Sequence, residues 1–257
     1  MLLTACTSAS ATGLAGTSTA RASTTSLCRY ATAKVSSGAY IVQNNEYASS
    51  ATECIRLAGD GPAFTVATSG IANPTNGAPG AYPSAYFGCH WGTCTTGSLA
   101  ARPVRVSGLR PGLVVSSWST AQPAAASNVY DVAYDIWVSR TPRTNAAPTG
   151  SEVMIWLGRR GPVVPMGRQV ATGVRIGNRA YNVWYSPPAT PGSGDTISYV
   201  MTRPTKSVSG LDIGTVIRDS VSRGYTNQSW YLIDVEAGFE LWHGGAGLAS
   251  KSFAVRG

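Results

Sequence analysis

Charged side chains are scarce in this sequence of 257 residues. Asp, Glu, Lys and Arg together make up 12% of the chain, about half the share usual in globular proteins. No run of apolar residues is long enough for a membrane-spanning helix. These shortages exclude coiled coils, charge-rich helical proteins and helical membrane proteins. The 29 Gly and 15 Pro instead supply the turns that many short strands require.

Histidine is also rare, and its scarcity removes several kinds of chemistry. His90 and His243 are the only two histidines, so a histidine-based catalytic triad has little support. The sequence has no GxSxG elbow, no HExxH motif and no P-loop. The glycines at 244–247 do not lead from a strand into a helix, which argues against nucleotide binding. We therefore expect neither a metal nor a cofactor.

Basic residues outnumber acidic ones by 20 to 12, which gives a net charge of +8. Such an excess raises the question of nucleic-acid binding. However, the basic residues are scattered, and Arg159-Arg160 is the only adjacent pair. We therefore expect a basic surface without a nucleic-acid partner.

The five cysteines indicate in which cellular compartment the protein is expected to fold. Cys89 and Cys94 bracket a short loop, Cys28 and Cys54 flank an expected strand, and Cys6 stands apart. Cys28–Cys54 with Cys89–Cys94 is the simplest of three pairings. Zinc binding would need CxxC-type pairs and more histidines. Disulfides predict an exported, extracellular protein.

The N-terminal region differs in composition from the rest of the chain. Residues 3–6 (LTAC) resemble a bacterial lipobox, but the two residues before them cannot form a signal sequence. Either the start codon is misplaced or the likeness is chance, so lipid anchoring through Cys6 stays open. Residues 7–26 are rich in Ser, Thr, Ala and Gly. We expect a tether over 1–26 and one folded domain over 27–257.

Several windows alternate between apolar and other residues, which is typical of strands with one face on a core. The clearest windows are 40–45, 130–138, 152–157, 181–185 and 234–242. Only residues 211–223 have helical spacing, with Gly224 suited to follow the helix end. We expect a loop over residues 186–194. The pattern predicts an all-β sandwich or barrel with one packed helix.

The second face of these strands carries Trp, Met and Tyr together with isolated acids. This mixture indicates a lined cleft, the alternative being a second core layer. Glu152 and Glu240 both lie in mid-strand positions, and Asp135 is a third acid of this kind. Glycoside hydrolysis needs two carboxyl groups that flank the scissile bond. The alternative for each glutamate is a structural acid bonded to Arg or Tyr.

The order and number of short motifs resemble glycoside hydrolase family 12, the secreted bacterial branch in particular. The likeness runs from about Cys28 to Val255. Its main motifs are VQNN at 42–45, PTNGAP at 74–79, GCHWG at 88–92, AYDIW at 133–137, EVMIWL at 152–157, GPVVPMG at 161–167 and AGFE at 237–240. The resemblance implies a jelly-roll β-sandwich of two antiparallel sheets, with a long cleft on its concave face.

By the same resemblance, Glu152 matches the nucleophile, Glu240 the acid/base, and Asp135 an acid that contacts the nucleophile. Further positions match the cleft lining: Asn45, Tyr47, His90, Trp91, Met154 and Trp156. For His90 the alternative is a loop residue that holds a backbone carbonyl. Tyr47 is a departure, because the family usually has Trp there, so we expect weaker sugar stacking.

The resemblance implies a retaining endo-β-1,4-glucanase (a cellulase) that acts as a monomer on a β-1,4-glucan. A xyloglucan-specific or mixed-linkage glucanase of the same fold is the first alternative. A family 11 xylanase is disfavoured by the MIW motif at 154–156. A non-catalytic glycan-binding jelly roll would keep the aromatic residues but would not need the paired acids. A structural or adhesive role has the least support.

Overall fold

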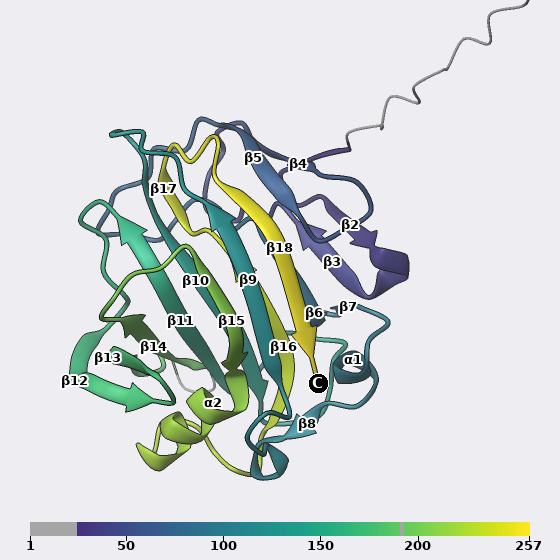
Figure 1. The fold of residues 1–257 in the computed structure, drawn as a ribbon, viewed down its shortest axis with the longest axis vertical. Coiled ribbons are helices and arrows are strands. Elements are labelled where there is room, and N and C mark those ends of the chain that lie inside the picture. The colour runs from purple at the N-terminus through teal and green to yellow at the C-terminus, as the bar shows by residue number, and fades with distance from the viewer. Residues whose placement is uncertain (1–24, 191–192) are drawn as a thin grey trace, which may run out of the picture.

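Two β-sheets packed face to face make up the computed structural model, which describes residues 25–190 and 193–257 (Figure 1). The smaller sheet has six strands in the order β1-β4-β5-β18-β9-β15. These strands are β1 (Ser26–Cys28), β4 (Glu53–Leu57), β5 (Phe64–Ser69), β9 (Val115–Ala121), β15 (Ser207–Asp212) and β18 (Ala249–Arg256). The expected two-sheet jelly-roll architecture is confirmed.

The larger sheet has twelve strands and carries the cleft. Its main path is β12-β13-β14-β11-β10-β16-β6-β3-β2, and β17, β7 and β8 pair with β10, β6 and β16. The strands are β2 (Thr32–Val35), β3 (Tyr40–Gln43), β6 (Ser84–His90), β7 (Thr93–Cys94), β8 (Val104–Arg105), β10 (Val129–Ser139), β11 (Ser151–Arg160), β12 (Arg168–Ile176), β13 (Arg179–Ser186), β14 (Asp195–Met201), β16 (Tyr231–Gly238) and β17 (Leu241–His243).

The core between the sheets contains the apolar faces that the alternation predicts. Tyr134 and Ile136 of β10 and Val235 of β16 are fully buried there, together with Trp118 of β9. Burying a side chain of this size stabilises the fold by about 1.5–3 kcal/mol. A separate small cluster of Ala133, Met154 and Trp156 lies apart from this core. The opposite face of the large sheet is therefore partly apolar as well.

Strand β10 lies at the centre of the large sheet and aligns residues from its two neighbours. Asp135 is directly opposite Met154 of β11 and Glu236 of β16. Trp137, two residues further on, is opposite Glu152 and Asp234. Because side chains at positions i and i+2 share a face, this register gathers the acids on one side of the sheet.

Two details differ from the sequence-based expectation. The β11–β14 pair is parallel, so the large sheet is not wholly antiparallel. The window 234–242 is not one strand, because β16 ends at Gly238 and β17 begins at Leu241. At this break Gly238 packs so closely that a Cβ would lie 2.3 Å from the Pro83 carbonyl oxygen. The interruption leaves Glu240 between two strands.

The helix expected over 211–223 is present as α2 (Ile213–Ser222). Its N-cap is Asp212, whose carboxylate accepts a 2.9 Å hydrogen bond from the Thr215 amide. Gly224 follows the helix with φ = +79°, a conformation that favours glycine. The structure also contains a one-turn helix, α1 (Ser98–Ala101), and two 3₁₀ turns at 36–38 and 106–108.

Both expected disulfides are present, and each joins residues that face one another across a strand pair. Cys28 of β1 pairs with Cys54 of β4, and Cys89 of β6 pairs with Cys94 of β7. The expected tether and Cys6 lie outside the described residues, except for the last positions of the tether. In the described part of the chain, no helix is long and apolar enough to cross a membrane.

Candidate active site

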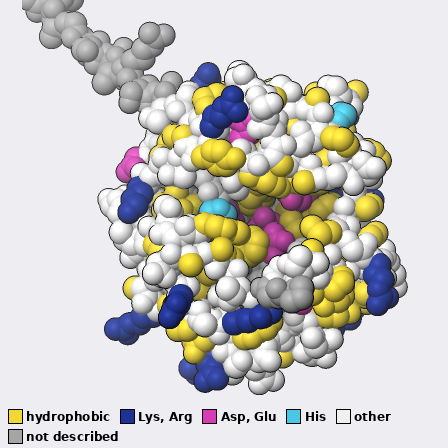
Figure 2. Space-filling view, turned by 180° about the vertical axis from the view of Figure 1, so that it is seen from behind, with side chains coloured by type: hydrophobic (Ala, Val, Ile, Leu, Met, Phe, Trp, Pro, Cys, Tyr) yellow, Lys and Arg dark blue, Asp and Glu magenta, His cyan; other side chains and the backbone are white. Residues whose placement is uncertain are grey.

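An open cleft on the large sheet consists of two adjoining cavities of about 530 and 590 Å³. Figure 2 shows acidic side chains at the floor of this hollow, with hydrophobic side chains around them. The two cavities share Tyr47, Glu152 and Glu240. The first is also lined by Tyr30, Asn45, Tyr82, His90, Trp91, Asp135 and Trp137. The second is also lined by residues that include Met154, Trp156, Val164, Met166, Thr196 and Trp242.

The structure brings all the candidate site residues of the sequence analysis to this cleft. The two glutamates lie where the cavities meet. Asp135 and four of the six expected binding residues line the first cavity, and Met154 and Trp156 line the second. The positions therefore agree with the expected cleft, whereas the role of each residue stays a prediction.

Glu152 lies in the middle of the sheet, on a strand that is hydrogen-bonded on both sides. Its Oε2 accepts a 2.9 Å hydrogen bond from Oγ1 of Thr196, the residue opposite it on β14. Burial raises the pKa of Glu152 to about 7, with a further rise from Glu236, while the Thr196 hydrogen bond acts in the opposite direction. Thr196 therefore favours the charged form of this carboxyl group.

Glu240 lies in the break between β16 and β17 and is paired with a second acid, Asp131 of β10. The Asp131 amide donates to the Glu240 carbonyl at 3.1 Å, and the Glu240 amide lies 3.3 Å from Oδ1 of Asp131. Burial, the charge of Asp131 and a hydrogen bond between the two carboxyls raise the pKa of Glu240 well above its usual range. Glu152 adds to this rise. Glu240 therefore holds a proton more firmly than Glu152 does.

Asp135 is 6% exposed and lies among other acids. Burial and then the charges of Glu152, Glu240 and Glu236 raise its pKa well above the ordinary value, while Tyr82 opposes the rise. The Tyr82 hydroxyl also donates to the carbonyl of Ala133 at 3.1 Å. This environment favours a protonated Asp135, which can donate a hydrogen bond.

Exposed aromatic rings lie along the cleft beside these acids. Trp91 is 49% exposed and Tyr47 is 43% exposed. The ring of Trp91 packs edge-on against Trp137, with centroids 4.8 Å apart. Aromatic faces of this kind stack on the apolar faces of sugar rings. The combination of exposed rings and buried carboxyls suits a glycan chain that crosses the acids.

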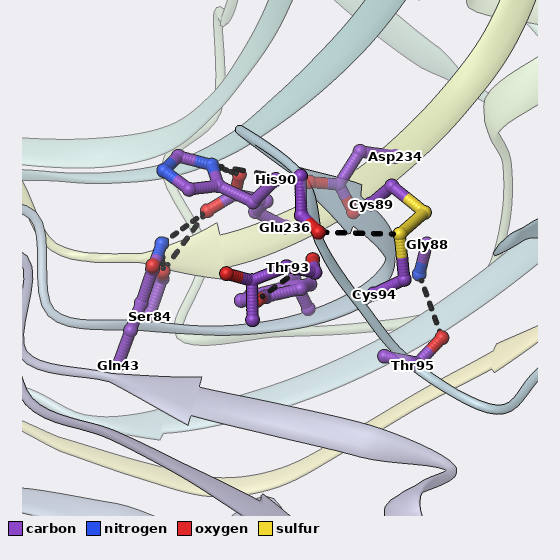
Figure 3. Close-up of polar contacts among 12 residues, drawn as sticks. Gln43, Ser84, Gly88, Cys89, His90, Thr93, Cys94, Thr95, Asp234 and Glu236 are labelled. Atoms are coloured by element: carbon purple, nitrogen blue, oxygen red, sulfur yellow. Dashed lines mark hydrogen bonds and ion pairs between the residues drawn. A yellow bond between two sulfur atoms is a disulfide. The ribbon is translucent and has the colours of Figure 1, made fainter. Parts of the chain in front are cut away.

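His90 makes a contact that the sequence analysis missed. Its Nδ1 lies 2.5 Å from Oε1 of Glu236, an acid of β16, rather than holding a backbone carbonyl (Figure 3). Oδ2 of Asp234 lies 4.0 Å from the same imidazole nitrogen. Among the described residues, His90, Asp234 and Glu236 form the one group whose donor atoms are close enough together to hold a metal ion, within 4.8 Å of one another.

Sequence reasoning also missed other residues at the site. Asp131, Trp137, Asp234 and Glu236 lie on faces that the alternation pattern identified, so that pattern could have found them. Three other residues line the cleft from segments outside the alternating windows, so the alternation pattern could not identify them: Tyr30, Tyr82 and Thr196. Six of the twelve Asp and Glu residues of the chain thus gather in and beside one cleft: Asp131, Asp135, Glu152, Asp234, Glu236 and Glu240.

Known structures share this architecture over nearly the whole described chain. Endoglucanase cel12A from Rhodothermus marinus superposes with a TM-score of 0.82 at 39% identity, covering 90% of this chain and 98% of that one. A family 12 xyloglucanase from Bacillus licheniformis has a TM-score of 0.75 at 24% identity, with 90% and 99% covered, and this likeness concerns the fold alone.

Sequence comparisons agree with the structural ones. A probable cellulase, Cel12b of Mycobacterium tuberculosis, is 30% identical over 130 residues, which is 51% of this chain and 82% of that protein. A probable xyloglucan-specific endo-beta-1,4-glucanase A of Neosartorya fischeri is 30% identical over 152 residues, 57% and 58% of the two chains. The family model for Glycosyl hydrolase family 12 matches residues 38–256. The chain therefore belongs to glycosyl hydrolase family 12 and is a glycoside hydrolase.

Proposed function

We propose that this glycoside hydrolase is a retaining endo-β-1,4-glucanase, which cleaves internal bonds of cellulose or related β-glucans by double displacement. The observation that carries the proposal is the convergence of Glu152, on β11, and Glu240, in the break between β16 and β17, at the junction of the two halves of one open cleft. A cleft that is open along its length accepts the middle of a polymer, which suits endo cleavage.

The different environments of the two glutamates supply their roles. Thr196 favours the charged form of Glu152, so Glu152 attacks the anomeric carbon and forms a glycosyl-enzyme. Burial and Asp131 keep Glu240 protonated, so Glu240 donates its proton to the leaving oxygen. After the leaving group departs, Glu240 accepts a proton from the water that releases the sugar. Asp135 orients Glu152 by a hydrogen bond.

Substrate preference separates the main proposal from its alternatives. Several relatives are named as xyloglucan-specific enzymes, so a xyloglucanase or mixed-linkage glucanase is the second candidate. The test measures reducing-sugar release from carboxymethylcellulose, barley β-glucan, xyloglucan and xylan. Release from the first two with a rapid fall in viscosity supports the proposal. Release from xyloglucan alone favours the second candidate, and release from none of the four contradicts both.

The stereochemical part of the proposal has its own test. In a retaining enzyme the first product formed from a β-glucan is the β-anomer, because two displacements each invert the carbon. Proton NMR recorded in the first minutes of hydrolysis, before mutarotation, distinguishes the anomers. An initial α-anomer would show single displacement and would contradict the nucleophile role of Glu152.

We also propose that the enzyme works outside the cytoplasm, as a monomer. The two disulfides support this location, because such bonds persist in oxidising compartments. No second subunit is needed to complete the cleft, since one chain supplies the acids and the aromatic rings that line it.

Replacing Tyr47 by Trp is expected to tighten substrate binding. Tyr47 is 43% exposed at the junction of the two cavities, and the larger indole ring would cover more of a sugar face. We expect KM on cello-oligosaccharides to fall roughly two- to five-fold with little change in kcat, which corresponds to about 0.5–1 kcal/mol. Tyr47→Phe, which keeps the ring size, serves as the matched control. An unchanged or higher KM for Tyr47→Trp would contradict the stacking role.

A further inference from the structure

Glu236 is a buried acid next to the proposed catalytic residues that the mechanism above does not use. It is 0% exposed and lies on β16, opposite Asp135 of β10 on one side and Tyr86 of β6 on the other. A carboxyl group in this position is costly unless hydrogen bonds or charges compensate its burial. Its partners therefore indicate which form it adopts.

Both carboxylate oxygens of Glu236 have close donors from neighbouring strands (Figure 3). Oε1 lies 2.5 Å from Nδ1 of His90. Oε2 accepts a 2.9 Å bond from Nε2 of Gln43 and a 3.1 Å bond from Oγ of Ser84. Burial acts against the charge, but the charge of His90 and hydrogen bonds with His90, Asp234 and Ser84 outweigh it and lower the pKa of Glu236. Glu236 is therefore an anion at the pH where the enzyme would work.

The neighbouring Asp234 is in the opposite state. It is 0% exposed, and its carboxyl group shares a hydrogen bond with that of Glu236. Burial and the charge of Glu236 raise its pKa well above the usual range. Asp234 is therefore neutral, and the pair carries a single negative charge, which is located on Glu236.

The contact between His90 and Glu236 joins the ring Nδ1 to the carboxylate Oε1 as a hydrogen bond. With Asp234 beside them, the three residues form a hydrogen-bonded charge cluster.

The fixed charge of Glu236 faces the acids of the proposed site. Asp135 is its direct neighbour across the sheet, and Glu152 lies on the next strand beyond. The charge of Glu236 raises the pKa of Asp135, where it adds to burial and to the charges of Glu152 and Glu240. It also raises the pKa of Glu152, where burial is the larger cause and the Thr196 hydrogen bond opposes it. The other titratable groups that face these acids or Glu236 are Tyr47, Tyr82, Tyr86, Asp131 and Glu240.

We propose that Glu236 is a positioning residue, whose charge, fixed opposite Asp135, helps to keep Asp135 protonated so that Asp135 donates a hydrogen bond toward Glu152. This inference rests on the proposed function, because it assigns Glu152 the nucleophile role. His90, Gln43 and Ser84 hold the Glu236 charge in place. Glu236 itself touches neither the substrate nor the reacting atoms, and it acts through its neighbour.

The sign of the expected effect follows from the charges. Replacing Glu236 by Gln removes a negative charge beside Asp135 and Glu152, so both groups lose their protons at lower pH. Activity requires a charged Glu152 and, by this proposal, a protonated Asp135. The acid limb of the kcat/KM profile, which belongs to Glu152, therefore moves to lower pH, and so does the part of the basic limb that belongs to Asp135. The part of the basic limb that belongs to Glu240 stays in place, because burial, Asp131 and Glu152 raise the pKa of that group. A like charge on a directly opposite residue of the sheet shifts a limb by roughly one pH unit.

The experiment compares kcat/KM profiles on soluble β-glucan for the wild type, Glu236→Gln and Asp234→Asn. Asp234→Asn is the matched control, because it exchanges a neutral buried group for another on the same strand, and its limbs should coincide with those of the wild type. A merely structural role of Glu236 would lower kcat in Glu236→Gln without moving either limb, and this result would overturn the proposal. Circular dichroism and Tm establish that each variant is folded.

His90→Gln provides an independent variant in case Glu236→Gln does not fold. It removes the interaction with His90 that offsets the Glu236 charge and leaves Glu236 bonded to Gln43 and Ser84, so the limbs should move to higher pH, the opposite direction. Unmoved limbs, or a shift to lower pH, would contradict the proposal. If the wild type itself releases no sugar, the proposed function fails. If the wild type is active and the limbs of the variants do not move, this inference alone fails.

Discussion

Replacing Glu152 by Gln is expected to lower kcat/KM on β-glucan by roughly 10⁴-fold or more. The amide keeps the size and the hydrogen-bonding capacity of the side chain, but it cannot attack the anomeric carbon. Thr196 donates to Oε2 of Glu152, and an amide oxygen can accept the same bond, so the fold should be retained. Initial rates of reducing-sugar release, with Tm measured in parallel, provide the test.

Glu53→Gln is the matched control for this variant. Glu53 is also a buried glutamate, but it lies on β4 of the other sheet, outside both cavities of the cleft. Burial raises its pKa to about 8, with a smaller rise from Glu46 and an opposing hydrogen bond from Asn44, so it is mainly neutral at pH 7 and a Gln resembles it. If Glu53→Gln hydrolyses β-glucan at the wild-type rate and Glu152→Gln is nearly inactive, the loss of activity is due to the change in the cleft and not to the replacement of a buried glutamate in general.

Chemical rescue separates a nucleophile from other essential roles. The substrate for this test is an aryl β-cellobioside with an activated leaving group. In Glu152→Ala, added azide can occupy the space of the lost carboxylate and attack the anomeric carbon from the face that Glu152 would attack. One displacement then gives the α-glycosyl azide, because the configuration inverts once. Recovery of activity with this product would support Glu152 as the nucleophile. Retained hydrolysis without azide would refute it.

Replacing Glu240 by Gln is expected to lower kcat/KM on β-glucan by roughly 10²–10⁴-fold, the usual contribution of a general acid. The loss should depend on the leaving group. A sugar hydroxyl needs the proton of Glu240 to depart, whereas 2,4-dinitrophenolate departs without one. The dinitrophenyl cellobioside should therefore show a rapid first turnover followed by slow release of the glycosyl-enzyme. Equal losses on both substrates would argue against the acid/base role.

The pH profile gives a second measure of the same role. Burial, Asp131 and Glu152 raise the pKa of Glu240, so the acid form persists to higher pH than an ordinary glutamate would allow. Activity that depends on this proton is present below the raised pKa and is lost as the pH rises through it. In Glu240→Gln, the basic limb that belongs to this group should be absent on the dinitrophenyl substrate.

Much of the fold could be predicted because alternation along a strand reflects burial on one face. The window 130–138 gave both the core face with Tyr134 and Ile136 and the cleft face with Asp135. The helix over 213–222 followed from its apolar spacing and from Gly224. The order of the short family motifs then indicated the jelly-roll topology. The alternation of apolar and other residues could not by itself distinguish a jelly roll from a barrel.

Other features depend on contacts between distant segments, which a single sequence does not encode locally. The parallel pairing of β11 with β14 brings Thr196 to Glu152, although 43 residues separate them along the chain. The break after Gly238 arises because that residue packs against the Pro83 carbonyl. The pairing of His90 with Glu236 likewise spans two strands. The sequence showed these acids on one face but not which of them carries the charge.

The concentration of acids in one cleft leaves the remaining surface strongly cationic. Half of the twelve carboxyl side chains lie at the site, and Glu46 and Glu53 are buried elsewhere, so four remain to balance the basic residues outside. Such a molecule carries its acidic groove within a polycationic shell. Polymers that bear uronic acids or sulfate groups would therefore retain it electrostatically, in a manner that added salt reverses, whereas neutral glucan would not.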